Sequence, residues 1–196
     1  MDTQDTSTTG KAELKIIEEM IANAKAKISE GSIFYLIWGW LVLIAAATNY
    51  ILLNFTDYPN HWIAWAVLMP LGGIVSGIVG YKKGKKAGVK TYIDRAMGYL
   101  WGGFGATLLV VLVAMIKIGP MAAYPILIFL YGLGTFVSGG ILKFKPLMIG
   151  GIACWVIGSI AVYVDFSDQL ILLAIAIVVS YLIPGHILAA RKEENV

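Results

Sequence analysis

Residues 33–53 read IFYLIWGWLVLIAAATNYILL and contain no Asp, Glu, Lys or Arg. A helix needs about 20 mostly apolar residues to cross the hydrocarbon core of a bilayer. This stretch therefore predicts a transmembrane helix, and five further apolar stretches follow it along the chain. The six predicted spans are approximately 33–53, 62–80, 97–118, 121–142, 147–164 and 170–189.

The composition of the 196-residue chain agrees with this interpretation. Hydrophobic residues make up 59% and charged residues 14% of the sequence, whereas a soluble domain has roughly 45–50% apolar and about 25% charged residues. A water-soluble fold of this length has too little interior to bury that excess. The composition therefore predicts an integral membrane protein.

The short links after most of the spans indicate that neighbouring helices run antiparallel. We therefore expect an all-α integral membrane protein with six transmembrane helices, arranged as three antiparallel hairpins. The predicted divisions are a disordered cytoplasmic tail plus an amphipathic helix over 1–31, the six-helix transmembrane bundle over 32–190, and a cytoplasmic tail over 191–196.

The basic residues predict the orientation of these spans. Lys and Arg concentrate in the cytoplasmic loops of membrane proteins. With six spans, all but one of the 15 basic residues lie on the same side, and Lys117 is the exception. The distribution predicts a multi-pass protein of the bacterial cytoplasmic (inner) membrane with both termini in the cytoplasm.

An amphipathic helix is expected over residues 11–30, ahead of the first span. Leu14, Ile17, Ile21 and Ile28 recur at spacings of three, four and seven, which places them along one face of a helix. The other face carries four Lys and four Glu, unlike a lipid-binding helix, which is usually strongly basic there. This helix is the candidate interaction element. A homo-oligomer, a separate protein partner and the protein's own cytoplasmic loops all remain open as its binding surface.

Few polar side chains lie inside the predicted spans. The candidate intramembrane polar or packing residues are Asn49, Ser76, Ser138 and His186. The hydroxyl and amide groups fit either a path for a neutral solute or hydrogen bonds between helices. His186 follows Pro184, where a kink is expected, near the cytoplasmic end of its span. It fits either a proton site or an interfacial side chain.

A short internal repeat relates the second and fourth spans. Residues 71–77 read LGGIVSG and residues 133–139 read LGTFVSG, so Ser76 and Ser138 occupy equivalent positions. The pattern fits a duplicated hairpin, and it also fits a chance match between glycine-rich helices. Small residues four apart, such as Gly73 with Gly77, predict close approach of another helix.

Several functional classes are disfavoured by the sequence. Cys154 is the single cysteine, so neither an intrachain disulfide nor a cysteine-based metal site is expected. His61 and His186 fall at opposite faces of the membrane, too far apart to share a haem or a metal. The sequence contains no nucleophile–base pair, phosphate-binding loop or nucleic-acid motif. We expect no catalytic residues, no cofactor, no metal and no nucleic acid, and the expected partner common to all alternatives is the lipid bilayer.

Residues 34–44, FYLIWGWLVLI, follow a short charged segment, and later spans carry LMPLGG at 68–73 and GYLW at 98–101. In these features the chain resembles an uncharacterised family of small six-helix bacterial membrane proteins. The resemblance implies the six-helix architecture and no particular activity. The architecture and glycine content are also similar to those of the HdeD-like repeat membrane proteins.

Two functional hypotheses follow from the sequence. The first is a non-enzymatic membrane protein that acts as an assembly or regulatory component through protein contacts. The alternative is a small permease or channel for a neutral or weakly charged solute. A closed bundle with an apolar interior favours the first, and a polar cavity open to one face favours the second.

Overall fold

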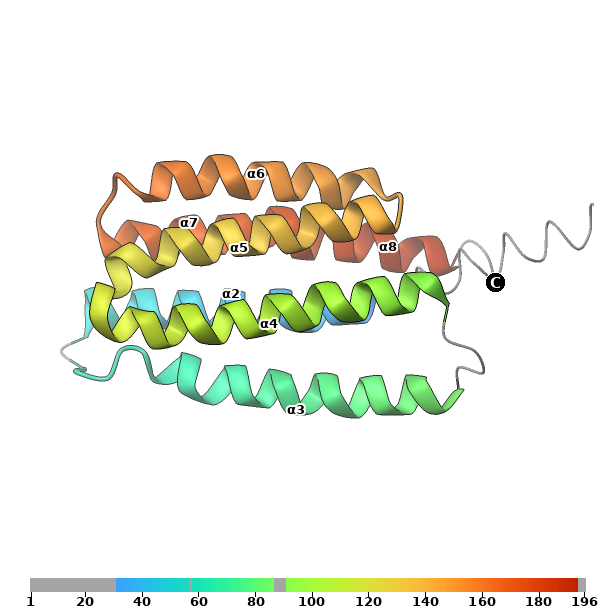
Figure 1. Cartoon of the computed structure of the whole chain (residues 1–196). Coiled ribbons are helices and arrows are strands. Elements are labelled where there is room, and N and C mark those ends of the chain that lie inside the picture. Colours follow the sequence, from blue (N-terminus) through green and yellow to red (C-terminus); the bar gives the residue numbers. More distant parts are fainter. Residues whose placement is uncertain (1–30, 57, 87–90, 194–196) are drawn as a thin grey trace, which may run out of the picture.

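The computed structural model describes residues 31–56, 58–86 and 91–193, and it places them almost entirely in helices (Figure 1). The helices are α2 (Ser32–Phe55), α3 (Ile63–Lys86), α4 (Tyr92–Ile118), α5 (Pro120–Ile141), α6 (Lys145–Ala161), α7 (Phe166–Ile177) and α8 (Ile183–Glu193). A π-helical segment, η1 (Val178–Leu182), joins α7 to α8. The predicted amphipathic helix, with Leu14, Ile17, Ile21 and Ile28, lies outside the described residues.

The expected all-helical chain of long apolar helices is confirmed. Helices α2, α3, α4 and α5 have 22 to 27 residues, which at 1.5 Å per residue exceeds the roughly 30 Å of a bilayer core. The continuous stretch from α7 through α8 is also long and apolar enough to cross a membrane. Helix α6 is shorter, with 17 residues, and it ends before the predicted limit of the fifth span at residue 164.

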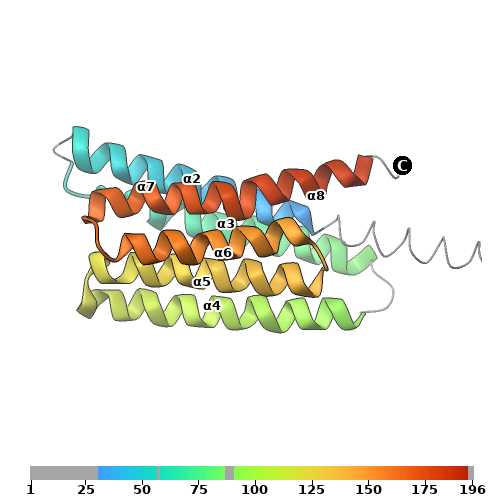
Figure 2. The ribbon, with the colours of Figure 1, turned by 90° about the horizontal axis from the view of Figure 1, so that it is seen from above.

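Successive long helices run in opposite directions (Figures 1 and 2). The α2–α3, α4–α5 and α6–α7 connections lie at one end, which we call the His61 end of the bundle. The end of α3, the beginning of α4, the α5–α6 connection and the end of α8 lie at the opposite end, which we call the Lys143 end. The closest helix pair is α5 with α6, and these belong to two different predicted hairpins. The grouping into three hairpins therefore stays a prediction.

The core lies where α2, α5, α6 and α7 meet. Its largest fully buried apolar side chains include Val42 on α2, Ile128 on α5, Leu147 on α6, and Leu170, Leu173 and Ile177 on α7. By contrast, α4 has no buried residue. Within the described part of the chain, the backbone of α3 comes close only to α2, and that of α4 only to α5. These two helices are therefore peripheral.

Glycines explain why α5 and α6 pack so closely. A Cβ added to Gly151 on α6 would lie 2.7 Å from the carbonyl oxygen of Gly132 on α5. A Cβ added to Gly139 would lie 2.7 Å from the backbone nitrogen of Met148. Because backbone atoms cannot move aside as a flexible side chain can, the two helices need glycine at these positions.

The π-helical segment stands just ahead of Pro184, where the sequence predicts a kink. Proline has no N–H to donate, and its ring collides with the carbonyl group four residues earlier in a regular α-helix. That carbonyl belongs to Ser180, inside η1. A π-helical turn is one way in which a helix relieves such a conflict, and it leaves α7 and α8 continuous.

Candidate functional site

A buried amide, Asn49, is the centre of a polar cluster near the His61 end of the bundle. Its side chain is 1% exposed. The Asn49 amide lies 2.8 Å from Nδ1 of His61, 3.0 Å from Nε1 of Trp65 and 3.4 Å from the hydroxyl of Tyr124. We call Asn49, His61, Trp65, Tyr124 and the adjacent Phe166 the Asn49 cluster.

The neighbours of the Asn49 amide fix its orientation. The indole Nε1–H of Trp65 can only donate, so the atom facing it is Oδ1, which accepts at 3.0 Å. The Asn49 Nδ2 group then donates to Nδ1 of His61 at 2.8 Å and lies 3.2 Å from the His61 carbonyl oxygen. The opposite orientation would place the Asn49 N–H groups against the Trp65 N–H. An amide orientation is assigned from its hydrogen bonds in this way.

Aromatic rings surround the amide and connect four elements. The ring centroids of Trp65 and Tyr124 are 6.2 Å apart, and those of Tyr124 and Phe166 are 5.0 Å apart, both edge to face. The His61 and Phe166 ring centroids are 6.3 Å apart. The cluster thus joins α2, the start of α3, α5 and α7.

The sequence identified only one member of this cluster. Asn49 is predicted as a site residue because it is an amide inside an apolar span, whereas the sequence excludes His61 as a partner of His186 and predicts no other role for it. Nothing in the spacing along the chain connects Asn49 with Tyr124, which is 75 residues away. A polar residue in an apolar span predicts that it has a buried polar partner. The sequence offers no other indication of this cluster.

A second group of aromatic side chains lies nearer the Lys143 end, and we call it the tyrosine cluster. It consists of Tyr35 on α2, Trp101 on α4, Tyr131 on α5 and Tyr181 in η1. Ring centroids are 5.9 Å apart for Tyr35 and Trp101, 5.7 Å for Tyr35 and Tyr181, and 5.6 Å for Tyr131 and Tyr181, all edge to face. Edge-to-face packing is a favourable arrangement of aromatic rings, and here it brings a side chain of α4 to α2 and η1.

The hydroxyl group of Tyr181 is buried and has no hydrogen-bond partner among the described residues. Leaving a buried hydroxyl without a partner costs roughly 1–3 kcal/mol. The ring of Tyr181 therefore stabilises the bundle, whereas its hydroxyl group does not contribute in this arrangement.

The other predicted site residues lie apart from Asn49. Ser138 is buried in the last turn of α5 and donates to the carbonyl oxygen of Gly134 at 2.7 Å. Ser76, its equivalent in the repeat, has a buried hydroxyl without a partner in the described residues. His186 is exposed on α8, at the Lys143 end. The structure does not bring these residues together into one site.

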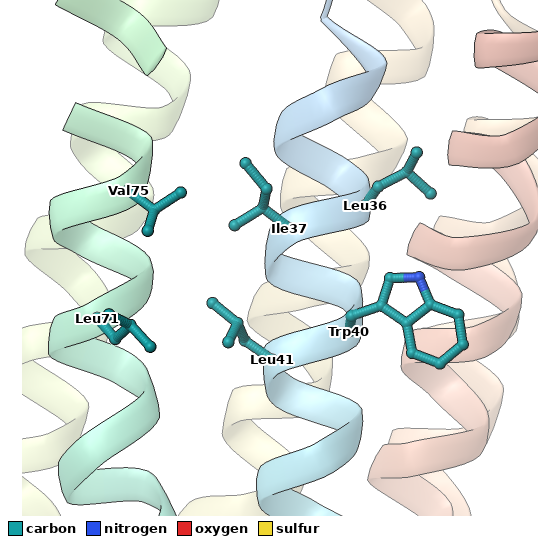
Figure 3. Close-up of a pocket in the computed structure, with 6 residues that line it drawn as sticks. All are labelled: Leu36, Ile37, Trp40, Leu41, Leu71 and Val75. Atoms are coloured by element: carbon teal, nitrogen blue, oxygen red, sulfur yellow. The ribbon is translucent and has the colours of Figure 1, made fainter. Parts of the chain in front are cut away.

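Two hollows on the described part of the bundle are apolar and open to its surface. One of about 330 Å³ is lined by Leu36, Ile37, Trp40, Leu41, Leu71 and Val75. Figure 3 shows Leu71 and Val75 on α3 pointing toward Ile37 and Leu41 on α2. A second cavity, of about 480 Å³, is lined by Ile118, Met121, Ala122, Pro125, Ile126, Phe129 and Val162. Neither lining offers a charged side chain, and the indole N–H of Trp40 is the single hydrogen-bonding side-chain group among the residues named.

The glycines of α3 and α4 contrast with those of α5 and α6. A Cβ added at most of the glycines of α3 and α4 would meet no atom within 4 Å. The glycines with this open space are Gly73, Gly77, Gly80 and Gly84 on α3 and Gly98, Gly102, Gly103 and Gly105 on α4. Both helices therefore present small residues to open space. In a membrane, such faces permit the close approach of another helix.

Among the described residues, no group of three or more His, Cys, Asp and Glu side chains is placed to hold a metal ion. The geometry offers instead a buried polar cluster, a buried aromatic cluster and two helices with open small-residue faces. A comparison of the chain with known protein families, with characterised proteins and with solved structures finds no match.

Proposed function

We propose that the protein is a non-enzymatic component of the bacterial inner membrane that acts in assembly or regulation through protein contacts. Its contact surface within the membrane is formed by α3 and α4. The observation that carries this proposal is that the backbone of each of these helices comes close to one neighbouring helix among the described elements and that most of their glycines face open space.

The packing of α5 on α6 supports the proposal from within the same chain. Gly139 on α5 belongs to the repeated LGxxVSG sequence and contacts α6 directly. Gly77 on α3 is its equivalent, and nothing lies within 4 Å of the position of its Cβ. Because close contact between membrane helices depends on small residues, the face of α3 around Gly77 is suited to a helix that the described part of the chain does not place there.

Neither of the two described hollows is the polar cavity that the alternative of a permease or channel predicts. A path for a neutral or weakly charged solute needs hydrogen-bonding groups along it. The described cavities are lined by aliphatic, aromatic and sulfur-containing side chains. The buried polar side chains Asn49, Thr135, Ser138 and Ser180 are instead hydrogen-bonded to protein groups.

The proposal includes the finer features that the sequence predicts. These are both termini in the cytoplasm, three antiparallel hairpins, and an interaction helix over residues 11–30 that binds another protomer or a separate protein. Such a helix would add a contact at the membrane surface to the contact that α3 and α4 make within the membrane.

Replacing Gly73 and Gly77 together with Leu tests the assembly surface. Leu favours a helix over Gly by about 1 kcal/mol per residue, and both positions have open space, so the protomer keeps its stability. We expect the added side chains to block close approach of a partner helix. The measurements are the protein mass in mild-detergent micelles by light scattering, and the recovery of co-purifying membrane proteins.

The matched control is Ile78→Leu, an exposed position on the same helix at which the size of the side chain is kept. The control should retain the mass and the partners of the unmodified protein. If the double variant retains them as well, α3 is not an assembly surface. A solute flux that appears only in liposomes containing the protein would support the permease instead.

A further inference from the structure

The Asn49 cluster depends on one protonation state of His61. Asn49 Nδ2 donates to Nδ1 of His61 at 2.8 Å, while Asn49 Oδ1 accepts from Trp65 at 3.0 Å. Nδ1 can accept a hydrogen bond only in the neutral imidazole that carries its proton on Nε2. The indole of Trp65 therefore selects the tautomer of His61 through the amide between them.

We propose that this arrangement is a pH-sensitive latch, in which protonation of His61 breaks the hydrogen bond between Asn49 and Trp65. In the imidazolium both ring nitrogens carry hydrogen, so Nδ1–H faces the N–H of Asn49. Turning the amide by half a rotation restores the contact with His61. That rotation presents Nδ2 to Trp65, whose Nε1–H can only donate.

Because Asn49 is buried, placing two hydrogen-bond donors against each other weakens the cluster. Asn49 is 1% exposed, so bulk water cannot readily replace the hydrogen bond that is lost. When His61 is charged, one orientation of the Asn49 amide places its N–H against Nδ1–H of His61, and the other places its N–H against Nε1–H of Trp65. The cluster is weaker in both orientations. The stabilisation that the cluster supplies is therefore present with the neutral imidazole of His61 and is lost with the imidazolium.

The segment held by the latch is the start of α3. The backbone of α3 comes close only to α2 among the described elements. Trp65 contacts Tyr124 of α5, and His61, just ahead of α3, contacts Phe166 of α7. These contacts tie the beginning of α3 to the core. Weakening the cluster therefore loosens this end of α3 and leaves its packing along α2 in place.

The titratable groups on the surrounding elements are Tyr124 on α5, Tyr50 on α2, and Asp165 and Asp168 at the beginning of α7. No ion pair joins His61 to either of these aspartates, both of which the structure describes. Carboxyl and phenol groups ordinarily titrate outside pH 5–8, the range in which histidine changes charge. Asp57, in the same connection as His61, lies outside the described residues.

The tautomer can be measured directly because the chain has two histidines. In full-length protein labelled with ¹⁵N-histidine and held in detergent micelles, His186→Gln leaves His61 as the single imidazole. We expect the ring ¹⁵N shifts at pH 8 to show a bare Nδ1 and a proton on Nε2. Between pH 8 and 5, the indole N–H resonance of Trp65, assigned with Trp65→Phe, should move with the same midpoint as His61.

Two variants separate the latch from a general effect of acid. His61→Gln should abolish the pH response of the Trp65 resonance. Asn49→Asp supplies two acceptors, so protonated His61 becomes the favoured form and the sign of the effect reverses. The melting temperature should fall by about 2–4 °C between pH 8 and 5 in the unmodified protein and rise in this variant.

A proton on Nδ1 at pH 8 would overturn the proposal. So would a Trp65 resonance that stays fixed while His61 titrates, or one that still shifts in His61→Gln. If Asn49→Asp does not fold, the tautomer and the Trp65 titration decide the question by themselves. The latch does not depend on α3 being an assembly surface, since none of these measurements involves a partner.

Discussion

Two kinds of buried polar side chain stand close to aromatic rings in this protein. The amide of Asn49 uses both of its polar atoms, with Trp65 and His61 as partners. The hydroxyl of Tyr181 is equally buried and finds no partner in the described structure. Because a buried polar group without a partner is costly and a paired one contributes modestly, these residues should respond to mutation in opposite ways.

Replacing Tyr181 with Phe removes a hydroxyl that makes no hydrogen bond and keeps the ring that packs on Tyr35 and Tyr131. We expect the free energy of unfolding to stay unchanged or to rise by about 1 kcal/mol. Tyr124→Phe is the matched control, because it removes a hydroxyl 3.4 Å from the Asn49 amide, and it should lower that free energy by about 0.5–1.5 kcal/mol. Thermal unfolding in detergent measures both. A clear loss of stability in Tyr181→Phe would show that its hydroxyl has a partner.

The helices differ in how they use glycine. Between α5 and α6, glycine is required because the backbones approach within contact distance, as the surroundings of Gly151 and Gly139 show. On α3, Gly77 has open space around it and carries no such requirement within the protomer. The same residue type therefore marks a formed interface in one pair of helices and an unoccupied face on another helix.

Gly151→Ala should destabilise the bundle by about 1–3 kcal/mol, as overpacking commonly does. The new Cβ would lie 2.7 Å from the Gly132 carbonyl oxygen and from the backbone nitrogen of Phe136, and neither atom can turn away. Gly77→Ala is the control and should raise the stability of the protomer by up to about 1 kcal/mol through helix propensity. Thermal unfolding of the two variants in the same detergent gives the comparison. Equal melting temperatures would mean that α5 and α6 can separate at little cost.

The whole molecule has one end that carries nearly all of its described basic residues. Lys82, Lys83, Lys85 and Lys86 lie in the last turns of α3, Arg95 in the first turn of α4, and Lys143 and Lys145 at the α5–α6 connection. The end of α3, the beginning of α4 and the α5–α6 connection all lie at the Lys143 end (Figure 2). Lys117, in the last turn of α4, is at the His61 end. Because basic loops stay in the cytoplasm, this asymmetry predicts that the His61 end faces outward.

Cysteine labelling tests this orientation cleanly, because the chain has one native cysteine and it is buried. In a Cys154→Ala background, Asn60→Cys should react with a membrane-impermeant maleimide in cells whose outer membrane is open to the reagent and whose inner membrane is intact. Gly84→Cys should react only after the inner membrane is permeabilised. The opposite pattern would reverse the predicted orientation and would place the His61 latch on the cytoplasmic side.

The sequence by itself determined the class of the protein and the position of its long helices. Apolar runs of about 20 residues leave little alternative, because a helix satisfies every backbone hydrogen bond within its own segment. The predicted limits of most spans therefore lie close to those of the helices, as for 33–53 and α2. The predicted span 170–189 likewise falls within the stretch from α7 through α8, where Pro184 marked the disturbance that the structure shows as a π-helical segment.

Only the tertiary structure decided which helices touch and which polar groups meet. All six spans are apolar on most of their surface, so the sequence shows no clear difference between a face that meets lipid and one that meets a helix. The sequence therefore does not predict that α5 packs most closely on α6, or that the backbones of α3 and α4 each come close to one other helix among the described elements. The members of the Asn49 cluster could not be predicted for the same reason. The sequence identifies Asn49 as a polar residue in a span, but its contact with Tyr124 joins residues 75 positions apart. Such a contact depends on how the helices rotate and tilt against one another, and this is set by the packing of the whole bundle.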